Sequence, residues 1–132
     1  DFGLTSLDIY QSFQTKVNSI KHDFLLFLLN CANKKKSVAG YGAAAKGNTL
    51  INYSGVKSDL INFVCDASVA KQGKHLPGSH IPILDPTALT ENTPDYLLIL
   101  PWNLADEVSD QLDYLRKKGT KFVTVIPELR IF

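Results

Sequence analysis

Residues 40–47 read Gly-Tyr-Gly-Ala-Ala-Ala-Lys-Gly and follow Ser37 and the apolar pair Val38-Ala39. Gly40, Gly42 and Ala45 match the G-x-G-x-x-G/A spacing of a strand–turn–helix unit that holds a phosphate. We predict a tight turn at Gly40, close approach of a phosphate at Gly42, and close contact between helix and strand at Ala45. The amides at the helix start would then face the anion. The same spacing also suits a tight strand–helix junction that binds nothing.

The sequence around this turn alternates between strand and helix patterns, which predicts a parallel sheet covered on both faces. We therefore predict a single α/β, Rossmann-like three-layer domain over residues 1–132, with a mostly parallel sheet of five or six strands and a long N-terminal helix. Pro82 favours an edge position for its strand, and Asn103 is a candidate helix cap. The predicted helices span residues 7–33, 43–54 and 103–118, with a short helical turn at 86–89, and the predicted strands span 37–41, 60–65, 81–84, 96–100 and 121–126, with a short final strand within 127–132.

Two of the predicted helices carry further signals. The N-terminal helix has one apolar stripe, whose members are three or four residues apart: Tyr10, Phe13, Val17, Ile20, Phe24 and Phe27. Such a stripe packs on a hydrophobic core or forms the seam of a coiled coil, and we expect the core. Ser6 is the candidate N-cap of this helix. In the second helix, Gly47 indicates close packing or the approach of a ligand, because glycine is unfavourable in a helix interior.

The composition is that of an ordinary globular domain, with 45% apolar and 20% charged residues and a net charge of +1. This charge balance gives no drive toward nucleic acid or acidic membranes, and we expect neither as a partner. The apolar run at residues 25–29 is far shorter than a membrane span. We expect Cys31 and Cys65 to be buried, reduced thiols of a cytoplasmic protein. Methionine is absent, even at position 1, so we expect a domain excised from a larger multidomain enzyme.

Three segments outside the glycine turn carry candidate ligand contacts. Asp66 ends the second predicted strand, where an acid binds ribose hydroxyls and disfavours a 2′-phosphate; the alternative is a solvated turn aspartate. Residues 71–80 read Lys-Gln-Gly-Lys-His-Leu-Pro-Gly-Ser-His and form either a second binding segment or a mobile basic loop, without the ligand spacing of a metal site. Trp102 follows the fourth predicted strand and either stacks on a base or sugar or packs under the next helix. No nucleophile, base or paired carboxylates indicate a catalytic site.

Four blocks of sequence, in this order, resemble the C-terminal domain of S-adenosylmethionine-dependent sugar C-methyltransferases. They read Gly-Tyr-Gly-Ala-Ala-Ala-Lys-Gly-Asn-Thr-Leu at 40–50, Lys-Gln-Gly-Lys-His-Leu-Pro-Gly-Ser-His-Ile-Pro-Ile at 71–83, Pro-Asp-Tyr-Leu-Leu-Ile-Leu-Pro-Trp-Asn-Leu at 94–104 and Ile-Pro-Glu-Leu-Arg-Ile at 126–131. The resemblance runs from about residue 2 to the end of the chain.

The resemblance implies an enzyme with an N-terminal zinc-binding domain, a central methyl-donor domain, and this C-terminal domain, which helps to hold a nucleotide-linked keto-deoxysugar. In such enzymes a base removes the acidic proton beside the keto group, and the enolate attacks the methyl group. The base, the S-adenosylmethionine site and the zinc site belong to the other domains, so no catalytic or metal-binding residue is expected here and the domain should be inactive alone. Residues 37–39 also lack the acid that precedes the glycine turn of a methyl-donor site.

By this resemblance, the partners of the domain are the nucleotide-linked sugar and the other domains of the same enzyme. A nicotinamide-dinucleotide-binding module of an oxidoreductase would share the glycine turn and Asp66, and a structural or oligomerising domain would use helix 7–33 as its interface. The residues expected to bind the substrate lie in the turn and in the segments that follow the predicted strands: Gly40, Tyr41, Gly42, Ala43, Ala44, Lys46, Asn48, Asp66, Lys71, His75, Pro101, Trp102 and Asn103.

Overall fold

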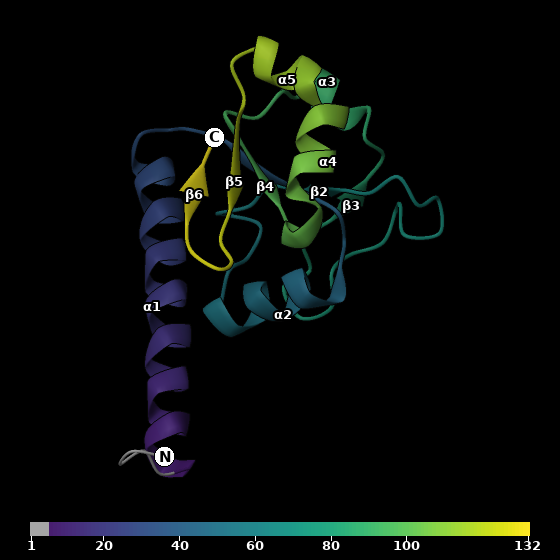
Figure 1. The fold of residues 1–132 in the computed structure, drawn as a ribbon. Helices are drawn as coiled ribbons and strands as arrows, with labels where there is room; N and C mark the ends of the chain where they lie inside the picture. Colours follow the sequence, from purple (N-terminus) through teal and green to yellow (C-terminus); the bar gives the residue numbers. More distant parts are fainter. Residues whose placement is uncertain (1–5) are drawn as a thin grey trace.

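The structure, a computed structural model, describes residues 6–132 (Figure 1). Helices and strands alternate along most of the chain, as predicted. The elements are α1 (Ser6–Asn33), β1 (Val38–Tyr41), α2 (Ala45–Ser54), β2 (Val64–Cys65), β3 (Ile83–Leu84), α3 (Ala88–Glu91), β4 (Tyr96–Ile99), the 3₁₀-helix η1 (Trp102–Leu104), α4 (Ala105–Gln111), α5 (Asp113–Lys117), β5 (Lys121–Thr124) and β6 (Arg130–Ile131).

The six strands form one sheet in the order β3-β2-β1-β4-β5-β6. Strands β1 to β5 run parallel to one another, and β6 is antiparallel to β5. The chain adds β2 and β3 on one side of β1 and then returns to place β4 on the other side. This reversal makes the carboxyl ends of β1 and β4 the switch point where ligands bind in open α/β sheets. The Rossmann-like prediction is confirmed, and so is the edge position of the strand that follows Pro82.

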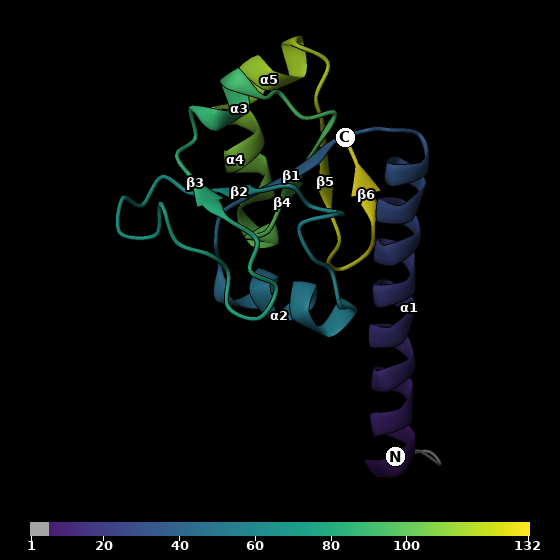
Figure 2. The same cartoon turned by 180° about the vertical axis from the view of Figure 1, so that it is seen from behind.

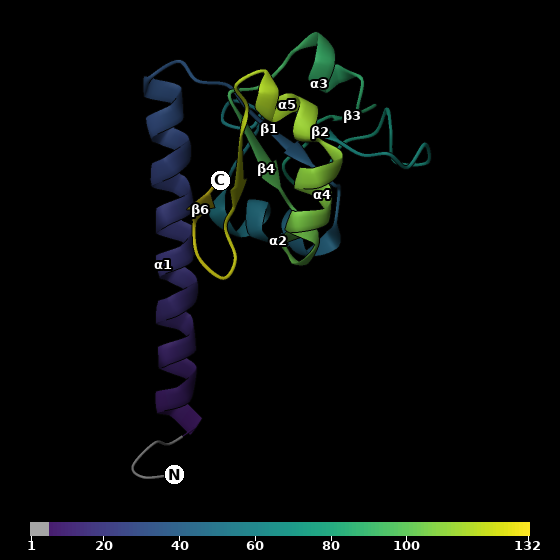
Figure 3. The same ribbon diagram turned by 45° about the horizontal axis from the view of Figure 1, so that its top comes forward.

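Helices cover both faces of the sheet (Figures 1 and 2). On one face, Phe24 and Leu28 of α1 pack with Ile51 of α2 in a core cluster. On the other face, helices α3, α4 and α5 contribute to a second cluster that includes Leu89 and Leu115. Figure 3 shows the sheet between these two layers. The result is the expected three-layer domain, with an apolar core on each side of the sheet.

Helix α1 lies beside β6, and its N-terminal end projects past the rest of the domain (Figures 1 and 2). The apolar stripe packs on the core where the domain lies beneath it, since Phe24 is fully buried and Phe27 packs against the cluster. Farther toward the N-terminus, Phe13 is 64% exposed. The core interpretation is thus confirmed for the C-terminal half of the stripe only. The predicted roles of the Ser6 and Tyr10 side chains lie outside the described part of the structure.

The predicted helix over residues 103–118 is wrong in detail, because the chain forms η1, α4 and α5 instead. The break falls at Leu112, which is buried, and a 2.9 Å hydrogen bond from the Leu115 amide to the Leu112 carbonyl tightens the backbone there. Asn103 lies inside η1, and no side chain caps that element. The stop at Gly119 is confirmed, since its φ of 101° is a left-handed conformation that suits glycine.

The strands are shorter than predicted. The strand predicted over 60–65 reduces to Val64 and Cys65. The amides of Leu60 and Ile61 bond instead to the carbonyl of Lys57, so these residues belong to a turn. Within residues 6–132, no helix combines the length and the apolar character that a bilayer crossing requires.

Candidate functional site

The backbone amides of the glycine turn after β1 have hydrogen-bond acceptors within the protein. The Gly42 amide donates to the carbonyl of Cys65 at 2.7 Å, and the Ala44 amide donates to the carbonyl of Gly42 at 2.9 Å. The Ala43 amide donates to Oδ2 of Asp66 at 2.7 Å. The turn therefore has internal partners at all three amides, and α2 begins only at Ala45, two residues later than predicted.

Two glycines of the turn and helix are needed for packing against the end of β4. A Cβ atom at Gly42, where φ is 87°, would lie 2.6 Å from Cδ of Pro101. A Cβ atom at Gly47 would lie 2.7 Å from Cβ of Leu100. The close approach of helix to strand is thus made at Gly47 and not at Ala45, which is exposed. The expectation for Ala45 is wrong because the helix begins later and presents Gly47 to the sheet.

The first turn of α2 leaves its positive end open. The amides of Ala45, Lys46 and Gly47 have no hydrogen-bond acceptor among residues 6–132. Ala44 occupies the N-cap position and has no side chain that could cap the helix, and the first turn contains no acid. The positive end of the helix dipole and the amides of the exposed residues Ala45 and Lys46 therefore lie beside the turn, whereas Gly47 is buried.

A cavity of about 430 Å³ adjoins this helix start. One wall is the beginning of α2, and the other is the segment between β2 and β3, which runs beside α2 in Figure 2. The lining comprises Ala43, Ala44, Ala45, Asn48, Ala70, Lys71, Lys74, His75, Leu76, Pro77 and Ile83. It contains two lysines and a histidine but no acid, so its charge favours an anionic ligand.

The polar groups of this cavity rest on an apolar base. Leu76 and Ile83 are 2% and 5% exposed, so they form a dry floor. Oδ1 of Asn48 is buried and has no hydrogen-bond partner in the described part of the chain. A buried acceptor without a partner is costly, so a donor that reached this atom would be favoured. The cavity thus combines apolar surface with a few polar groups, as small-molecule sites do.

The basic segment over residues 71–80 is an ordered part of the fold. His75 forms an antiparallel bridge with Pro82. The Leu76 amide donates to the carbonyl of Ile81 at 2.8 Å, and Nδ2 of Asn52 in α2 donates to the carbonyl of Pro77 at 3.0 Å. These bonds fix His75 and its neighbours next to α2, which argues against the mobile-loop alternative.

Asp66 connects the turn to this segment. Its Oδ1 accepts the Ser68 amide at 2.8 Å, while its Oδ2 holds the Ala43 amide. Nζ of Lys71 donates to the carbonyl of Ala43 at 3.2 Å and lies 3.9 Å from Oδ2 of Asp66. Asp66 is therefore not a freely solvated turn aspartate, whereas its predicted contact with a ribose stays a prediction.

The structure separates the predicted site residues into two groups. Five of them line the cavity, and Asp66 lies directly behind its wall: Ala43, Ala44, Asn48, Lys71 and His75. The others lie outside the lining. Tyr41 belongs to the core cluster on the opposite face, Pro101 covers Gly42, Trp102 is half-buried in η1, and Lys46 and Asn103 are exposed.

Burial also determines the chemistry of the buried ionisable groups. Desolvation, followed by the charge of Asp66, raises the pKa of Tyr41. Desolvation, with a smaller contribution from Asp85, raises the pKa of the Cys65 thiol to about 12. Cys65 is thus a neutral thiol at physiological pH and no nucleophile. Among residues 6–132, no group of three or more His, Cys, Asp or Glu side chains is placed to hold a metal ion.

Sequence reasoning missed part of the lining. Lys74 lies on the cavity between Lys71 and His75, and its place in the same basic segment was the signal for it. Leu76 and Pro77 lie in the same segment and Ile83 follows it, but these apolar residue types do not indicate ligand contact, and their place depends on the bridge between His75 and Pro82. The apolar part of a cavity is set by tertiary pairing, which leaves no local pattern.

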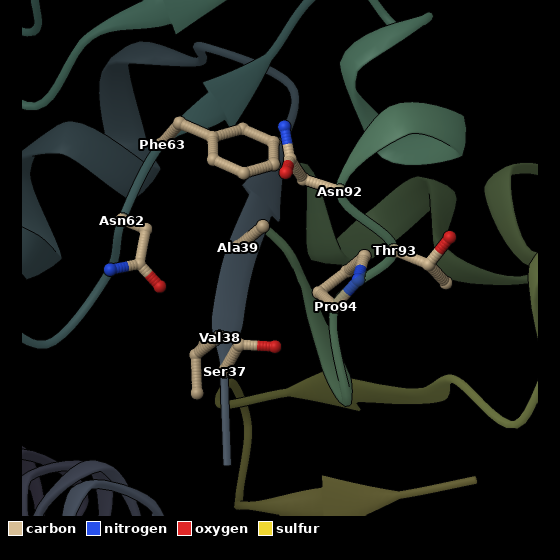
Figure 4. A pocket seen from close by; sticks show the side chains of 8 residues that line it. All are labelled: Ser37, Val38, Ala39, Asn62, Phe63, Asn92, Thr93 and Pro94. Atoms are coloured by element: carbon tan, nitrogen blue, oxygen red, sulfur yellow. The ribbon is translucent and has the colours of Figure 1, made fainter. Parts of the chain in front are cut away.

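A second cavity of about 430 Å³ lies at the opposite edge of the sheet, where β1, β2 and β4 begin (Figure 4). The ring of Phe63 and the carboxamide of Asn92 lie at one end of it, above Ala39. Its lining contains no charged side chain: Ser37, Val38, Ala39, Asn62, Phe63, Asn92, Thr93 and Pro94. The nearby Asp95 carboxylate accepts the Ser37 amide at 2.8 Å. This cavity has none of the anion-binding features of the first.

Comparison with known proteins confirms the resemblance noted in the sequence. Residues 1–127 match the family described as C-methyltransferase C-terminal domain. The chain is also 36% identical over 129 residues to C-methyltransferase NovU from Streptomyces niveus. That match covers 98% of this chain and 31% of NovU, so the chain spans about a third of the length of this relative. The chain therefore belongs to the family of C-methyltransferase C-terminal domains.

Proposed function

We propose that this domain binds the nucleotide-linked sugar substrate of an S-adenosylmethionine-dependent C-methyltransferase, in the cavity between α2 and the segment 70–77. The observation that carries the proposal is the meeting of an open helix start with a basic lining. Ala45 lines the cavity and its amide has no acceptor in the described part of the chain, while Lys74 and His75 line the same cavity from the segment between β2 and β3. A diphosphate needs such an arrangement of backbone donors and cations.

The remaining lining suits the uncharged parts of such a ligand. Leu76 and Pro77 offer apolar surface, and the unpaired Oδ1 of Asn48 accepts a hydrogen bond from a hydroxyl or an amide. A cavity of about 430 Å³ holds only part of a nucleotide-linked sugar, so the rest of the substrate extends toward the other domains of the enzyme. In this proposal the domain grips the substrate.

The chemical step takes place outside this domain. A base removes the proton from the carbon beside the keto group, the resulting carbanion carbon bonds to the methyl carbon, and the bond from that methyl group to sulfur breaks. Cys65 and Tyr41 are buried and remain protonated at neutral pH, so neither serves as the base. The methyl donor and the base are supplied by other parts of the longer enzyme, and this domain contributes orientation.

Calorimetric titration of the 132-residue chain tests the proposal, with thymidine diphosphate, thymidine and NAD as the three ligands. We expect thymidine diphosphate to bind and thymidine to bind much more weakly, because the helix amides and cations act on the diphosphate. Binding of NAD without binding of thymidine diphosphate would instead identify a dinucleotide-binding module. Absence of binding with all three ligands would contradict the proposal and favour a structural role.

A further inference from the structure

We propose that Asp66 is a positioning residue, which binds no ligand and instead holds the two walls of the nucleotide cavity in register. This inference rests on the proposed function. Asp66 is absent from the lining of the cavity, and its side chain is only 15% exposed. It nevertheless contacts both walls, because it lies at the carboxyl end of β2 between the glycine turn and the basic segment.

The first set of contacts fixes the wall made by α2. Oδ2 of Asp66 accepts the Ala43 amide at 2.7 Å, which is the short distance of a charge-assisted hydrogen bond. Ala43 lines the cavity and lies two residues before the first residue of α2. The position of this bond sets where the free amides of the first helical turn point. Asp66 acts on them through the backbone.

The second set of contacts fixes the opposite wall. Oδ1 of Asp66 accepts the Ser68 amide at 2.8 Å, and its backbone carbonyl accepts Nε2 of Gln72 at 2.8 Å. Nζ of Lys71 lies 3.9 Å from the carboxylate and donates to the Ala43 carbonyl at 3.2 Å. The ammonium group of Lys71 is therefore held beside Ala43, on the wall of the cavity at the start of α2.

A positioning role for Asp66 and a purely electrostatic effect predict opposite changes in the affinity for a diphosphate when Asp66 is replaced. Asp66 is an acid close to a site for an anion, so removal of its charge should tighten the binding of a diphosphate if charge alone mattered. If Asp66 instead holds Ala43 and Lys71 in place, its removal should weaken binding. Whether the affinity rises or falls therefore distinguishes the two roles, whatever the size of the change.

The experiment is a calorimetric titration of thymidine diphosphate into the wild type, Asp66→Asn, Asp66→Ala and Asp85→Asn. Asparagine keeps one acceptor, so we expect Asp66→Asn to bind more weakly than the wild type. Alanine loses the acceptors of both the Ala43 and the Ser68 amides, so we expect Asp66→Ala to bind about tenfold more weakly than the wild type. Asp85 follows β3 and accepts the Thr87 amide, so Asp85→Asn removes a charge near the same sheet edge without touching the turn. It should bind as tightly as the wild type or more tightly.

A second measurement distinguishes positioning from direct contact. Raising the salt concentration should weaken binding by about the same factor in Asp66→Asn and in the wild type, because the variant removes no lysine from the cavity. Lys74→Ala should show a smaller salt effect. Equal or tighter binding by both Asp66 variants would overturn the inference while leaving the proposed function intact. Absence of binding by the wild type would overturn the proposed function and the inference with it.

Discussion

The two cavities at opposite edges of the sheet have the same volume, about 430 Å³, but very different linings. The carboxyl-edge cavity has Lys71, Lys74 and His75 beside the open start of α2. The amino-edge cavity has an aromatic ring, two carboxamides and no charge (Figure 4). The contrast teaches that volume does not identify the site for a phosphorylated ligand. That site is identified by free backbone hydrogen-bond donors and by the positive charge of the lining.

The topology explains why the two edges differ. In a parallel sheet, each following helix begins near the carboxyl ends of the strands, so the positive end of a helix such as α2 gathers at that edge. Helix C-termini gather at the other edge, and their partial negative charge is met here by cations such as Lys34 and Lys117. Cations at the amino edge thus oppose the negative charge of helix C-termini. Cations at the carboxyl edge instead add to the positive charge at the start of α2.

The largest effect should follow from removal of the side-chain donors that distinguish the carboxyl edge. The double variant Lys74→Ala/His75→Ala should lose about a hundredfold in affinity for thymidine diphosphate, since two charge-assisted contacts are lost. The matched variant Asn62→Ala/Asn92→Ala at the amino edge should keep wild-type affinity. Calorimetry measures the affinity of both double variants. Equal losses of affinity would contradict the assignment of the ligand site to the carboxyl edge.

The next effect concerns the packing that places α2 at the carboxyl edge. Gly47→Ala should destabilise the domain by about 2 kcal/mol, because the new Cβ would meet Cβ of Leu100, an atom that cannot move away. Helix propensity alone predicts the opposite, a gain of about 1 kcal/mol. Thr49→Ala, on the exposed side of the same helix, should stabilise slightly. Urea unfolding gives the sign, and a stabilised Gly47→Ala would refute the close contact.

A smaller effect tests the inertness of the thiol at the carboxyl edge. Because Cys65 has a pKa of about 12 in the folded state against 9.0 as its reference, the folded state retains a proton that the unfolded state loses above about pH 9. The free energy of unfolding should therefore fall as the pH rises, by about 1 kcal/mol between pH 8 and pH 10 relative to Cys65→Ala. Denaturant titration of both proteins measures this difference, and a constant difference would mean that Cys65 ionises normally.

The smallest effect is the response of ligand binding to salt. Raising the ionic strength from about 50 to 200 mM should weaken thymidine diphosphate binding about threefold, because exposed cations at the rim are screened. Thymidine lacks the phosphates, so its weak binding should not change. The same weakening for both ligands would show that the lysines of the carboxyl edge do not meet the phosphates.

The sequence predicts the architecture well because its signals are local. Alternating strands and helices, the stop at Gly119 and the edge strand after Pro82 all follow from residue types and spacing. The break at Leu112 could not be predicted, because the residues on both sides of it have helical patterns. Burial of Leu112 and Leu115 in one cluster decides the backbone there.

The site was predictable only in part. Ala43 and Lys71 lie in segments with a recognisable composition, and the structure brings both to one cavity. The separation of Trp102 from that cavity could not be foreseen, since its strand does end at the predicted edge. The turn is also less like a phosphate cradle than its spacing indicates, because Pro101 covers Gly42 and Asp66 holds Ala43. These contacts join residues far apart in the chain.

The most direct test of the central claim is an NMR titration of the ¹⁵N-labelled domain with thymidine diphosphate. We predict that amide shifts change at residues 43–48 and 70–76 and stay constant at residues 37–39, 62–63 and 92–93. Changes confined to the amino-edge residues would contradict the assignment of the substrate site to the carboxyl edge.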